Sequence, residues 1–278
     1  MPRDQRTLLN RLATTVAALS ESAGFTIIPN WRLQQYPQAT YLRRLLSLLE
    51  IDCVLDVGAN LGQYHDFLRS EVRYEGTIVS FEPIPANVAA LRQRARQDPR
   101  WVIEGCALGR TSGTAPFNVM ANDEFSSFLT PDHTATDRFT RLNRVQHIVE
   151  VEVRTLHDVV PALERDLHAS GLYLKLDTQG YDLEVVAGAG EAIARFRGVQ
   201  TEASVTPIYE GAPDFHTTIH TLQSLGFDLS GIFPNNPHHF PSMVEFDCYM
   251  VARSRIGPGR GNLEHRTPQP RGVDSTHS

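Results

Sequence analysis

Short apolar runs alternate with amphipathic helical patterns along most of the chain. The apolar runs have the length and composition of β-strands and are found at Cys53–Val57, Thr77–Phe81, Trp101–Leu108, Leu172–Leu176, Val199–Val205 and Phe246–Ala252. Apolar residues at helical spacing occupy most of the intervals, at Gln63–Ser70, Pro85–Gln97, Leu156–Ala169, Tyr181–Phe196 and Asp214–Leu225. This alternation favours an α/β fold, in which a parallel sheet is covered by helices on both faces. The runs CVLDV and LYLKL are almost continuously apolar, as expected of strands buried on both sides.

The N-terminal region carries helical patterns without strands between them. Residues 6–20 and 41–49 are rich in leucine at helical spacing. We interpret residues 1–50 as a helical cap that packs on a main domain formed by residues 51–255.

Two further segments depart from the alternation. Residues 110–155 form a long insertion, in which the extended runs 114–120 and 148–154 flank a stretch rich in Asn, Asp, Ser and Thr. Long insertions of this kind are often active-site lids or binding loops. Residues 256–278 consist largely of glycine, proline and polar residues with almost nothing to bury, so this tail is predicted to be disordered.

The composition excludes several classes of protein. The 278 residues are 41% hydrophobic and 21% charged, which is ordinary for a globular protein. The formal net charge of −6 argues against nucleic-acid binding, which normally requires a basic face. The N-terminal residues are too charged for a signal peptide, and no apolar stretch approaches the ~20 residues of a membrane span. The three cysteines lie in separate apolar runs without a CxxC pair, which favours reduced thiols in a cytoplasmic protein.

The stretch after the run CVLDV carries candidate chemistry. Asp56 lies inside this run, and the chain then turns at Gly58 and Gly62, where a helical pattern begins. Such a turn lets the backbone approach a ligand, and the helix behind it offers unpaired N–H groups. A dinucleotide and S-adenosylmethionine are the two candidate ligands. The dinucleotide fingerprint needs a glycine where this chain has Asn60, and the carboxylate of Asp56 would repel phosphates but suit a sulfonium cation.

A second acid supports a ligand that contains a ribose. The run TIVSFEP contains Glu82, one strand–helix–strand unit after Asp56. Doubly wound folds place a carboxylate at this point to accept hydrogen bonds from ribose hydroxyls. We therefore predict that the glycine turn and Glu82 together bind S-adenosylmethionine.

Polar residues also cluster at the end of the run LYLKL. Asp177 ends this run, Gln179 follows it, and Glu202 lies within the next strand-like run. Because ligands of open parallel sheets bind beyond the carboxyl ends of the strands, these side chains are expected at the mouth of one site. An alcohol needs a general base or a metal before it can attack a methyl donor, so Asp177, Gln179 and Glu202 are the candidate catalytic residues. The two carboxylates would act as base or as ligands of Mg²⁺. Lys175, inside the same run, is expected to pair with Asp177 or Glu202.

Longer motifs occur in a fixed order between Val54 and Phe227. They read VLDVGANLGQ, IVSFEPIPANVAALR, CALG, NDEFSSFL, LKLDTQGYDLEVVAGA and TEASVTPIYEG. In this order they resemble the FkbM-type methyltransferase family. The resemblance implies a Rossmann-like class I methyltransferase fold with a mostly parallel, seven-stranded sheet, S-adenosylmethionine as methyl donor, and transfer to an oxygen. Hydroxyls of sugars, on natural products or glycolipids, are common acceptors in such relatives.

The resemblance also implies roles for individual residues. The cofactor loop corresponds to Asp56, Gly58, Asn60 and Gly62, the ribose acid to Glu82, the segment that lines the adenine to Cys106 and Ala107, and an N-x-x-x-S-S element to Asn122, Ser126 and Ser127. Many relatives have a glutamate where this chain has Gln179, and the missing charge weakens the prediction of a Mg²⁺ site. His157 stands where relatives commonly have an aspartate, at a position that we interpret as part of a helix cap.

Three functions are compatible with these patterns. The first is an S-adenosylmethionine-dependent O-methyltransferase that acts on a small-molecule, sugar or glycolipid acceptor. The second is an NAD-dependent oxidoreductase, against which the incomplete dinucleotide fingerprint counts. The third is a methyltransferase-like binding protein without catalytic activity, against which the intact cofactor loop and Asp177 count.

Overall fold

A seven-stranded sheet forms the centre of the molecule. The computed structural model describes residues 26–134, 136–235 and 241–256. The strands of the sheet are β1 (Cys53–Val57), β2 (Thr77–Phe81), β3 (Trp101–Glu104), β7 (Leu172–Leu176), β8 (Phe196–Ser204), β9 (Phe227–Pro234) and β10 (Glu245–Ala252). Their order is β3-β2-β1-β7-β8-β10-β9, and only β10 runs antiparallel to its neighbours. The expected α/β fold with a mostly parallel, seven-stranded sheet is thereby confirmed.

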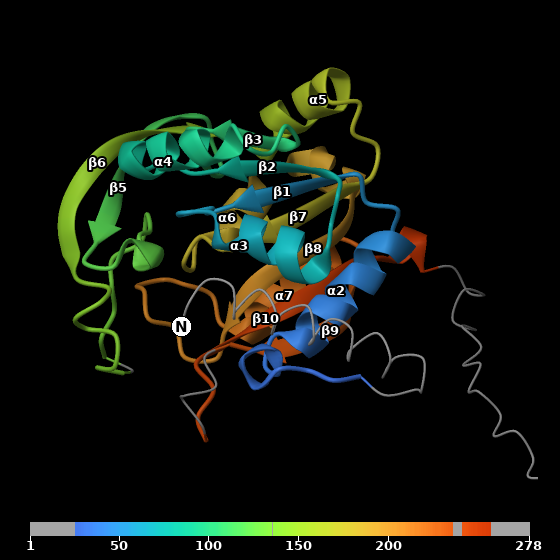
Figure 1. Ribbon diagram of the computed structural model, residues 1–278. Coiled ribbons are helices and arrows are strands. Elements are labelled where there is room, and N and C mark those ends of the chain that lie inside the picture. The colour runs from blue at the N-terminus through green and yellow to red at the C-terminus, as the bar shows by residue number, and fades with distance from the viewer. Residues whose placement is uncertain (1–25, 135, 236–240, 257–278) are drawn as a thin grey trace, which may run out of the picture.

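Helices cover both faces of this sheet (Figure 1). One face, here called the first face, packs against α2 (Tyr36–Leu48), α3 (Gln63–Phe67), the π-helical η2 (Leu68–Val72) and α4 (Pro85–Ala95). The second face packs against α5 (Leu156–Asp166), α6 (Asp182–Ala187) and α7 (Phe215–Ser224). Because side chains alternate along a strand, β1 sends Leu55 to the second face and Val54 to the first.

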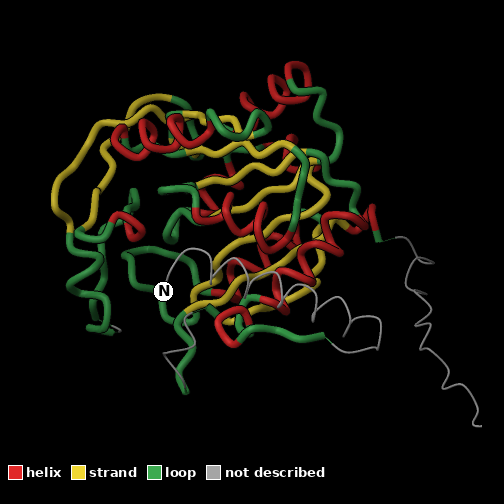
Figure 2. The backbone as a smooth tube through the Cα atoms, viewed as in Figure 1, coloured by secondary structure: helices red, strands yellow, loops and turns green. Residues whose placement is uncertain are grey.

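The insertion forms a small second sheet. Strands β5 (Gly113–Met120) and β6 (Val145–Arg154) pair antiparallel, and the short β4 (Ala107–Leu108) pairs with β6. Figure 2 shows this ribbon arching away from the main sheet. The connection between its strands carries the 3₁₀ turn η3 (Asp123–Phe125), which lies beside the carboxyl ends of the main strands.

Glycines explain two wrong predictions of element length. A single strand over residues 101–108 was expected, but the regular strand is interrupted at Gly105 and Cys106, and the run divides into β3 and β4, which belong to different sheets. The helix expected over residues 181–196 ends at Ala187. A Cβ on Gly188 would lie 2.0 Å from the carbonyl oxygen of Gly109, and the chain continues as the 3₁₀ helix η4 (Gly190–Arg195).

Two other elements differ from the sequence-based expectation. The helix expected over residues 63–70 divides into α3 and η2, with a change from α to π geometry at Leu68. Strand β9 was not expected at all. It is the edge strand of the sheet and only its first residue, Phe227, is buried, so it lacks a strand-like apolar pattern.

The ends of the chain are described only in part. The second expected cap helix is present as α2 and begins earlier than expected, at Tyr36. The first expected cap helix, residues 6–20, and the expected disordered tail after residue 256 lie outside the described residues. Among the residues that are described, no helix combines the length and the hydropathy needed to cross a bilayer.

Candidate active site

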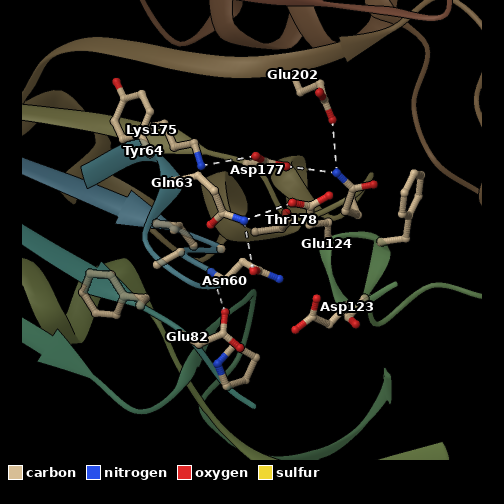
Figure 3. Close-up of a pocket in the computed structure, with 18 of the residues that line it drawn as sticks. Asn60, Gln63, Tyr64, Glu82, Asp123, Glu124, Lys175, Asp177, Thr178 and Glu202 are labelled. Atoms are coloured by element: carbon tan, nitrogen blue, oxygen red, sulfur yellow. Dashed lines mark hydrogen bonds and ion pairs between the residues drawn. The ribbon is translucent and has the colours of Figure 1, made fainter. Parts of the chain in front are cut away.

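A cavity of about 440 Å³ opens at the carboxyl ends of β1, β2, β7 and β8, and Figure 3 shows part of its lining. Its size lies in the range of about 300–1,000 Å³ that is typical of small-molecule sites. The carboxyl groups that line it are those of Glu82, Asp123, Glu124, Asp177, Glu202, Glu245 and Asp247. Lys175 is the one cationic side chain among the described lining residues. The lining therefore suits a cationic or a neutral polar ligand better than a phosphate.

The turn after β1 brings the backbone against the end of β7. Gly58 has a φ of 84°, and a Cβ at this residue would lie 1.9 Å from the carbonyl oxygen of Asp177, so only glycine fits. The N–H groups of Gly58 and Ala59 each donate to the carbonyl oxygen of Phe81 at 3.1 Å. The turn is thus fixed between β2 and β7, with its backbone in the cavity wall.

Glu82 follows β2 and is held against this turn. Its carboxylate oxygens accept hydrogen bonds from the N–H groups of Asn60 and Ile84, both at 2.8 Å. Burial raises the pKa of Glu82 to about 7, although both hydrogen bonds act in the opposite direction. A fixed carboxyl group therefore stands beside the turn and in the lining of the cavity, where it can meet hydroxyl groups of a ligand (Figure 3).

A row of polar residues crosses the first face of the sheet. The strand registers place Ser80, Asp56, Lys175, Gln200 and Tyr249 side by side on β2, β1, β7, β8 and β10. Asp56 is fully buried, accepts a hydrogen bond from the Ser80 hydroxyl at 3.0 Å, and has the Lys175 Nζ at 3.1 Å from its Oδ1. Asp56 is therefore not exposed to the cavity, and its charge is balanced by Lys175.

Lys175 connects this row to the cavity. Its Nζ lies 3.3 Å from Asp177 Oδ2 and 5.0 Å from the centre of the Tyr64 ring. Burial alone would lower the pKa of Lys175, but the carboxylates of Asp177 and Asp56 outweigh it and raise the pKa. The expected pair with Asp177 is present. The alternative pair with Glu202 is not present, because the register sets Lys175 opposite Gln200 on β8 and opposite Asp56 on β1.

Gln179 joins the two candidate catalytic carboxyl groups. Its Nε2 donates to Asp177 Oδ1 at 3.0 Å and to Glu202 Oε2 at 3.2 Å (Figure 3), and its Oε1 lies 3.1 Å from the Tyr209 hydroxyl. Gln179 has a φ of 53°, which is uncommon for a residue other than glycine. Burial raises the pKa of Glu202 well above its ordinary value, and the neighbouring Glu245 and Asp177 act in the same direction. Glu202 therefore favours its protonated form.

The insertion closes one side of the cavity. Gln63 Nε2 donates to Glu124 Oε1 at 3.0 Å, and Asn87 Nδ2 donates to Asp123 Oδ2 at 3.1 Å, so η3 is tied to the helices behind β1 and β2. The Ser127 hydroxyl donates to the carbonyl oxygen of Gln179 at 2.9 Å. These contacts hold η3 at the edge of the cavity, where Asp123 and Glu124 are part of the lining (Figure 3).

Most of the residues singled out from the sequence come together in this cavity. Those that line it are Gly58, Asn60, Glu82, Ala107, Ser126, Asp177, Gln179 and Glu202. Four others stand behind the lining. Asp56 pairs with Lys175, Gly62 packs against Trp101, Cys106 is buried with its pKa raised to about 11 by burial, and Asn122 caps η3 by accepting from the Glu124 N–H.

Sequence reasoning missed several lining residues. They are Gln35, Gln38, Gln63, Tyr64, Asp123, Glu124, Gln200, Asn235, Glu245 and Asp247. A signal was present for Asp247, because it is a charged residue between Phe246 and the apolar run that follows it in β10. No local signal marks Gln38, whose helix reaches the cavity only through tertiary packing.

The expected Mg²⁺ has no support from side-chain clustering. Within the described ranges, no group of three or more His, Cys, Asp or Glu side chains is arranged to hold a metal ion. The two carboxyl groups nearest the expected metal, Asp177 and Glu202, are instead bridged by the amide of Gln179.

The chain is similar to known methyltransferases. Residues 56–229 match the methyltransferase FkbM domain. The chain is 30% identical over 173 residues to 31-O-demethyl-FK506 methyltransferase FkbM of Streptomyces tacrolimicus, over 55% of this chain and 65% of that protein. It is 27% identical over 200 residues to 2-O-methyltransferase NoeI of Sinorhizobium fredii (strain NBRC 101917 / NGR234), over 69% of this chain and 79% of that protein. A solved structure, methyltransferase FkbM of Methylobacillus flagellatus KT, is 16% identical with a TM-score of 0.47, over 73% of this chain and 44% of that one.

The sheet topology, with a cavity at the carboxyl ends of its strands, is that of the class I methyltransferase fold. The family match covers more than half of the chain and includes the turn at Gly58, Glu82, Asp177 and Glu202. The chain belongs to the methyltransferase FkbM domain family. Membership of this family argues against the hypothesis of an NAD-dependent oxidoreductase.

Proposed function

We propose that the chain transfers a methyl group from S-adenosylmethionine to a hydroxyl oxygen of a sugar, in a glycosylated natural product or a glycolipid. The observation that carries this proposal is the arrangement of one cavity. A glycine turn and Glu82 lie at one end, and the Asp177–Gln179–Glu202 cluster lies at the other. The names of the two sequence relatives, a 31-O-demethyl-FK506 methyltransferase and a 2-O-methyltransferase, support oxygen as the accepting atom.

The residues around the turn fit S-adenosylmethionine. When bound, this molecule supplies an activated methyl group on a positively charged sulfur. The backbone at Gly58 and Asn60 would lie against it, and Glu82 would accept hydrogen bonds from its ribose. Lys175 neutralises Asp56, so Asp56 is not the acid that favours a cationic ligand. The cavity-facing carboxyl groups of Asp123 and Glu124 now supply the negative field that favours a cation over a pyrophosphate.

Asp177 is the group that we assign as general base. Lys175 and Gln179 hold its two carboxylate oxygens from opposite sides, at 3.3 Å and 3.0 Å. An oriented carboxylate in this position would accept the hydroxyl proton as the new carbon–oxygen bond forms. Glu202 is the weaker candidate for this role, because burial favours its protonated form, in which it cannot accept that proton. Alignment of the hydroxyl with the methyl group supplies further acceleration.

A cytoplasmic location is part of this proposal. It is supported by Cys53, Cys106 and Cys248, which are all free and buried. Unpaired cysteines of this kind are usual in reducing compartments. The acceptor would therefore be methylated before any export from the cell.

Ligand binding to the purified chain tests the proposed cofactor. S-adenosylhomocysteine, at 100 times its dissociation constant, should raise the free energy of unfolding by about 2.7 kcal/mol, whereas NAD should not. The variant Glu82→Ala should bind S-adenosylhomocysteine more weakly, and Glu75→Ala, which changes an exposed acid before β2, should bind it like the wild type. Stabilisation by NAD alone would overturn the proposal. No response to either ligand would favour a binding protein without this cofactor.

A further inference from the structure

One side of the cavity comes from outside the family match. The matched segment, residues 56–229, contains the turn, Glu82 and the Asp177 cluster. The lining residues outside it are Gln35, Gln38, Asn235, Glu245 and Asp247. These residues lie in the segments that precede β1 and follow α7, which fold back onto the same end of the sheet.

Three of these residues form a polar surface together with β8. Asp247 accepts hydrogen bonds from Gln200 Nε2 at 3.3 Å and from Gln38 Nε2 at 2.5 Å. Glu202 accepts from Asn235 Nδ2 at 2.8 Å, in addition to Gln179. We call Gln38, Gln200, Glu202, Asn235 and Asp247 the amide–carboxyl wall.

The wall brings two acids together at a cost. Glu202 and Asp247 are direct partners in the antiparallel pair of β8 and β10, so their side chains point to the same face. Two carboxylates directly opposite each other would repel, which disfavours ionisation of both groups. Burial raises the pKa of Asp247 to about 6, and the charge of Asp177 acts in the same direction. An apolar pair at these two positions would pack without this repulsion. We therefore infer that the two acids serve the binding of a ligand in the cavity and not the stability of the sheet.

Alternating amide and carboxyl groups match the chemistry of a polyhydroxyl ligand. Each hydroxyl both donates and accepts, so it can donate to a carboxyl oxygen and accept from the neighbouring amide. The wall adjoins Asp177, because Gln179 bridges Asp177 and Glu202. A sugar whose reacting hydroxyl meets Asp177 would therefore present its other hydroxyls to the wall.

Gln38 is placed in the wall by the packing of α2. This helix lies over β9 and β10 (Figure 1), where Tyr41 packs on Phe233 and Tyr249, with ring centres 5.2 Å apart in both pairs. Gln38 Nε2 also donates to the Tyr249 hydroxyl at 2.8 Å. The side chain is thus held by two partners and is still part of the cavity lining.

We propose that Gln38 and Asp247 determine which acceptor the enzyme methylates, by binding hydroxyl groups of the sugar that do not react. The inference rests on the proposed function and adds to it the residues that recognise the acceptor. It assigns acceptor choice to segments outside the shared domain, whereas cofactor binding and proton transfer stay inside it.

Steady-state kinetics of two variants test this inference. The acceptors are methyl glycosides of glucose, galactose, mannose, fucose and rhamnose, with saturating S-adenosylmethionine and detection of S-adenosylhomocysteine. Gln38→Leu and Asp247→Asn should each raise KM for the accepted glycoside by roughly tenfold and change kcat by less than about threefold. With the wild type, a deoxy glycoside that lacks the contacted hydroxyl should have a lower kcat/KM than the parent glycoside. With Gln38→Leu, the two glycosides should have nearly equal kcat/KM values.

A matched control separates recognition from the packing of α2. Tyr41→Phe removes a side-chain hydrogen bond of 2.6 Å from the same helix to Ser230, away from the cavity, and should leave KM unchanged. An equal rise of KM in Tyr41→Phe, or an unchanged KM in both wall variants, would overturn the inference while the proposed function stands. If S-adenosylhomocysteine binds but no glycoside is methylated, hydroxyl recognition by the wall is wrong. If S-adenosylhomocysteine does not bind, the proposed function itself fails.

Discussion

The two faces of the central sheet carry different kinds of side chain, even at neighbouring positions of the same strands. On the second face, neighbouring strands present Leu55, Leu174 and Val199, all fully buried among apolar residues. One residue further along β1, β7 and β8, the first face presents Asp56, Lys175 and Gln200, which are also buried but paired with one another or with nearby polar groups.

The difference separates stability from chemistry. The second face gains its stability from the removal of apolar surface from water, which is not directional. The first face contains a buried ion pair, which adds little net stability compared with an apolar pair but responds strongly to the loss of one partner. The polar row of the first face leads into the cavity, through Lys175 and Asp177.

The largest expected effect concerns the end of the polar row. Asp177→Asn removes the proposed base but keeps the shape of the side chain, so turnover should fall by about 10²–10⁴-fold. The dissociation constant for S-adenosylhomocysteine should change by less than about threefold. Single-turnover methylation and calorimetric titration measure the two quantities. Asp166→Asn, on the exposed surface of α5, is the control, and a variant at Asp177 that retains full turnover would place the base elsewhere.

The next effect concerns the buried ion pair. Lys175→Met leaves Asp56 buried without a cation, so the free energy of unfolding should fall by about 3–5 kcal/mol. The double variant Asp56→Leu with Lys175→Met removes both charges and should recover most of this loss. Urea unfolding of the three proteins measures it. Equal stability of the wild type and Lys175→Met would show that the pair does not behave as a buried one.

The apolar face should respond in stability alone. Leu174→Ala removes a fully buried side chain next to Lys175 and leaves a cavity, which should cost about 3 kcal/mol. Affinity for S-adenosylhomocysteine, measured at a temperature where the variant is folded, should stay at the wild-type value. A loss of affinity comparable to that of Glu82→Ala would contradict the separation of the two faces.

The smallest expected effect is a dependence of stability on pH. Burial raises the pKa of Glu82 from the ordinary 4.5 to about 7, so the folded chain holds this proton more tightly than the unfolded chain. The resulting stabilisation is fully present below pH 4.5 and is lost as the pH rises through 7. Between pH 5 and pH 8 the ligand-free wild type should lose about 2 kcal/mol more than Glu82→Gln. Parallel pH profiles of the two proteins would remove Glu82 as the cause.

Much of the fold could be predicted because its signals are local. Apolar runs and helical spacing identified most strands and helices of the main sheet, and Gly58 marked a turn that no other residue can form at that point. Strand β9 escaped because an edge strand with one exposed face lacks the apolar run that identifies a buried strand. The break at Gly188 escaped because it depends on the approach of Gly109, which is distant in sequence.

The sequence by itself located the glycine turn and the Asp177 cluster, because both follow strand ends that local patterns reveal. Only the tertiary structure decided that Asp56 pairs with Lys175, since strand register is a contact between distant segments. It also decided that Gln38 and Asp247 complete the cavity, because helix α2 and strand β10 meet only after the sheet has formed.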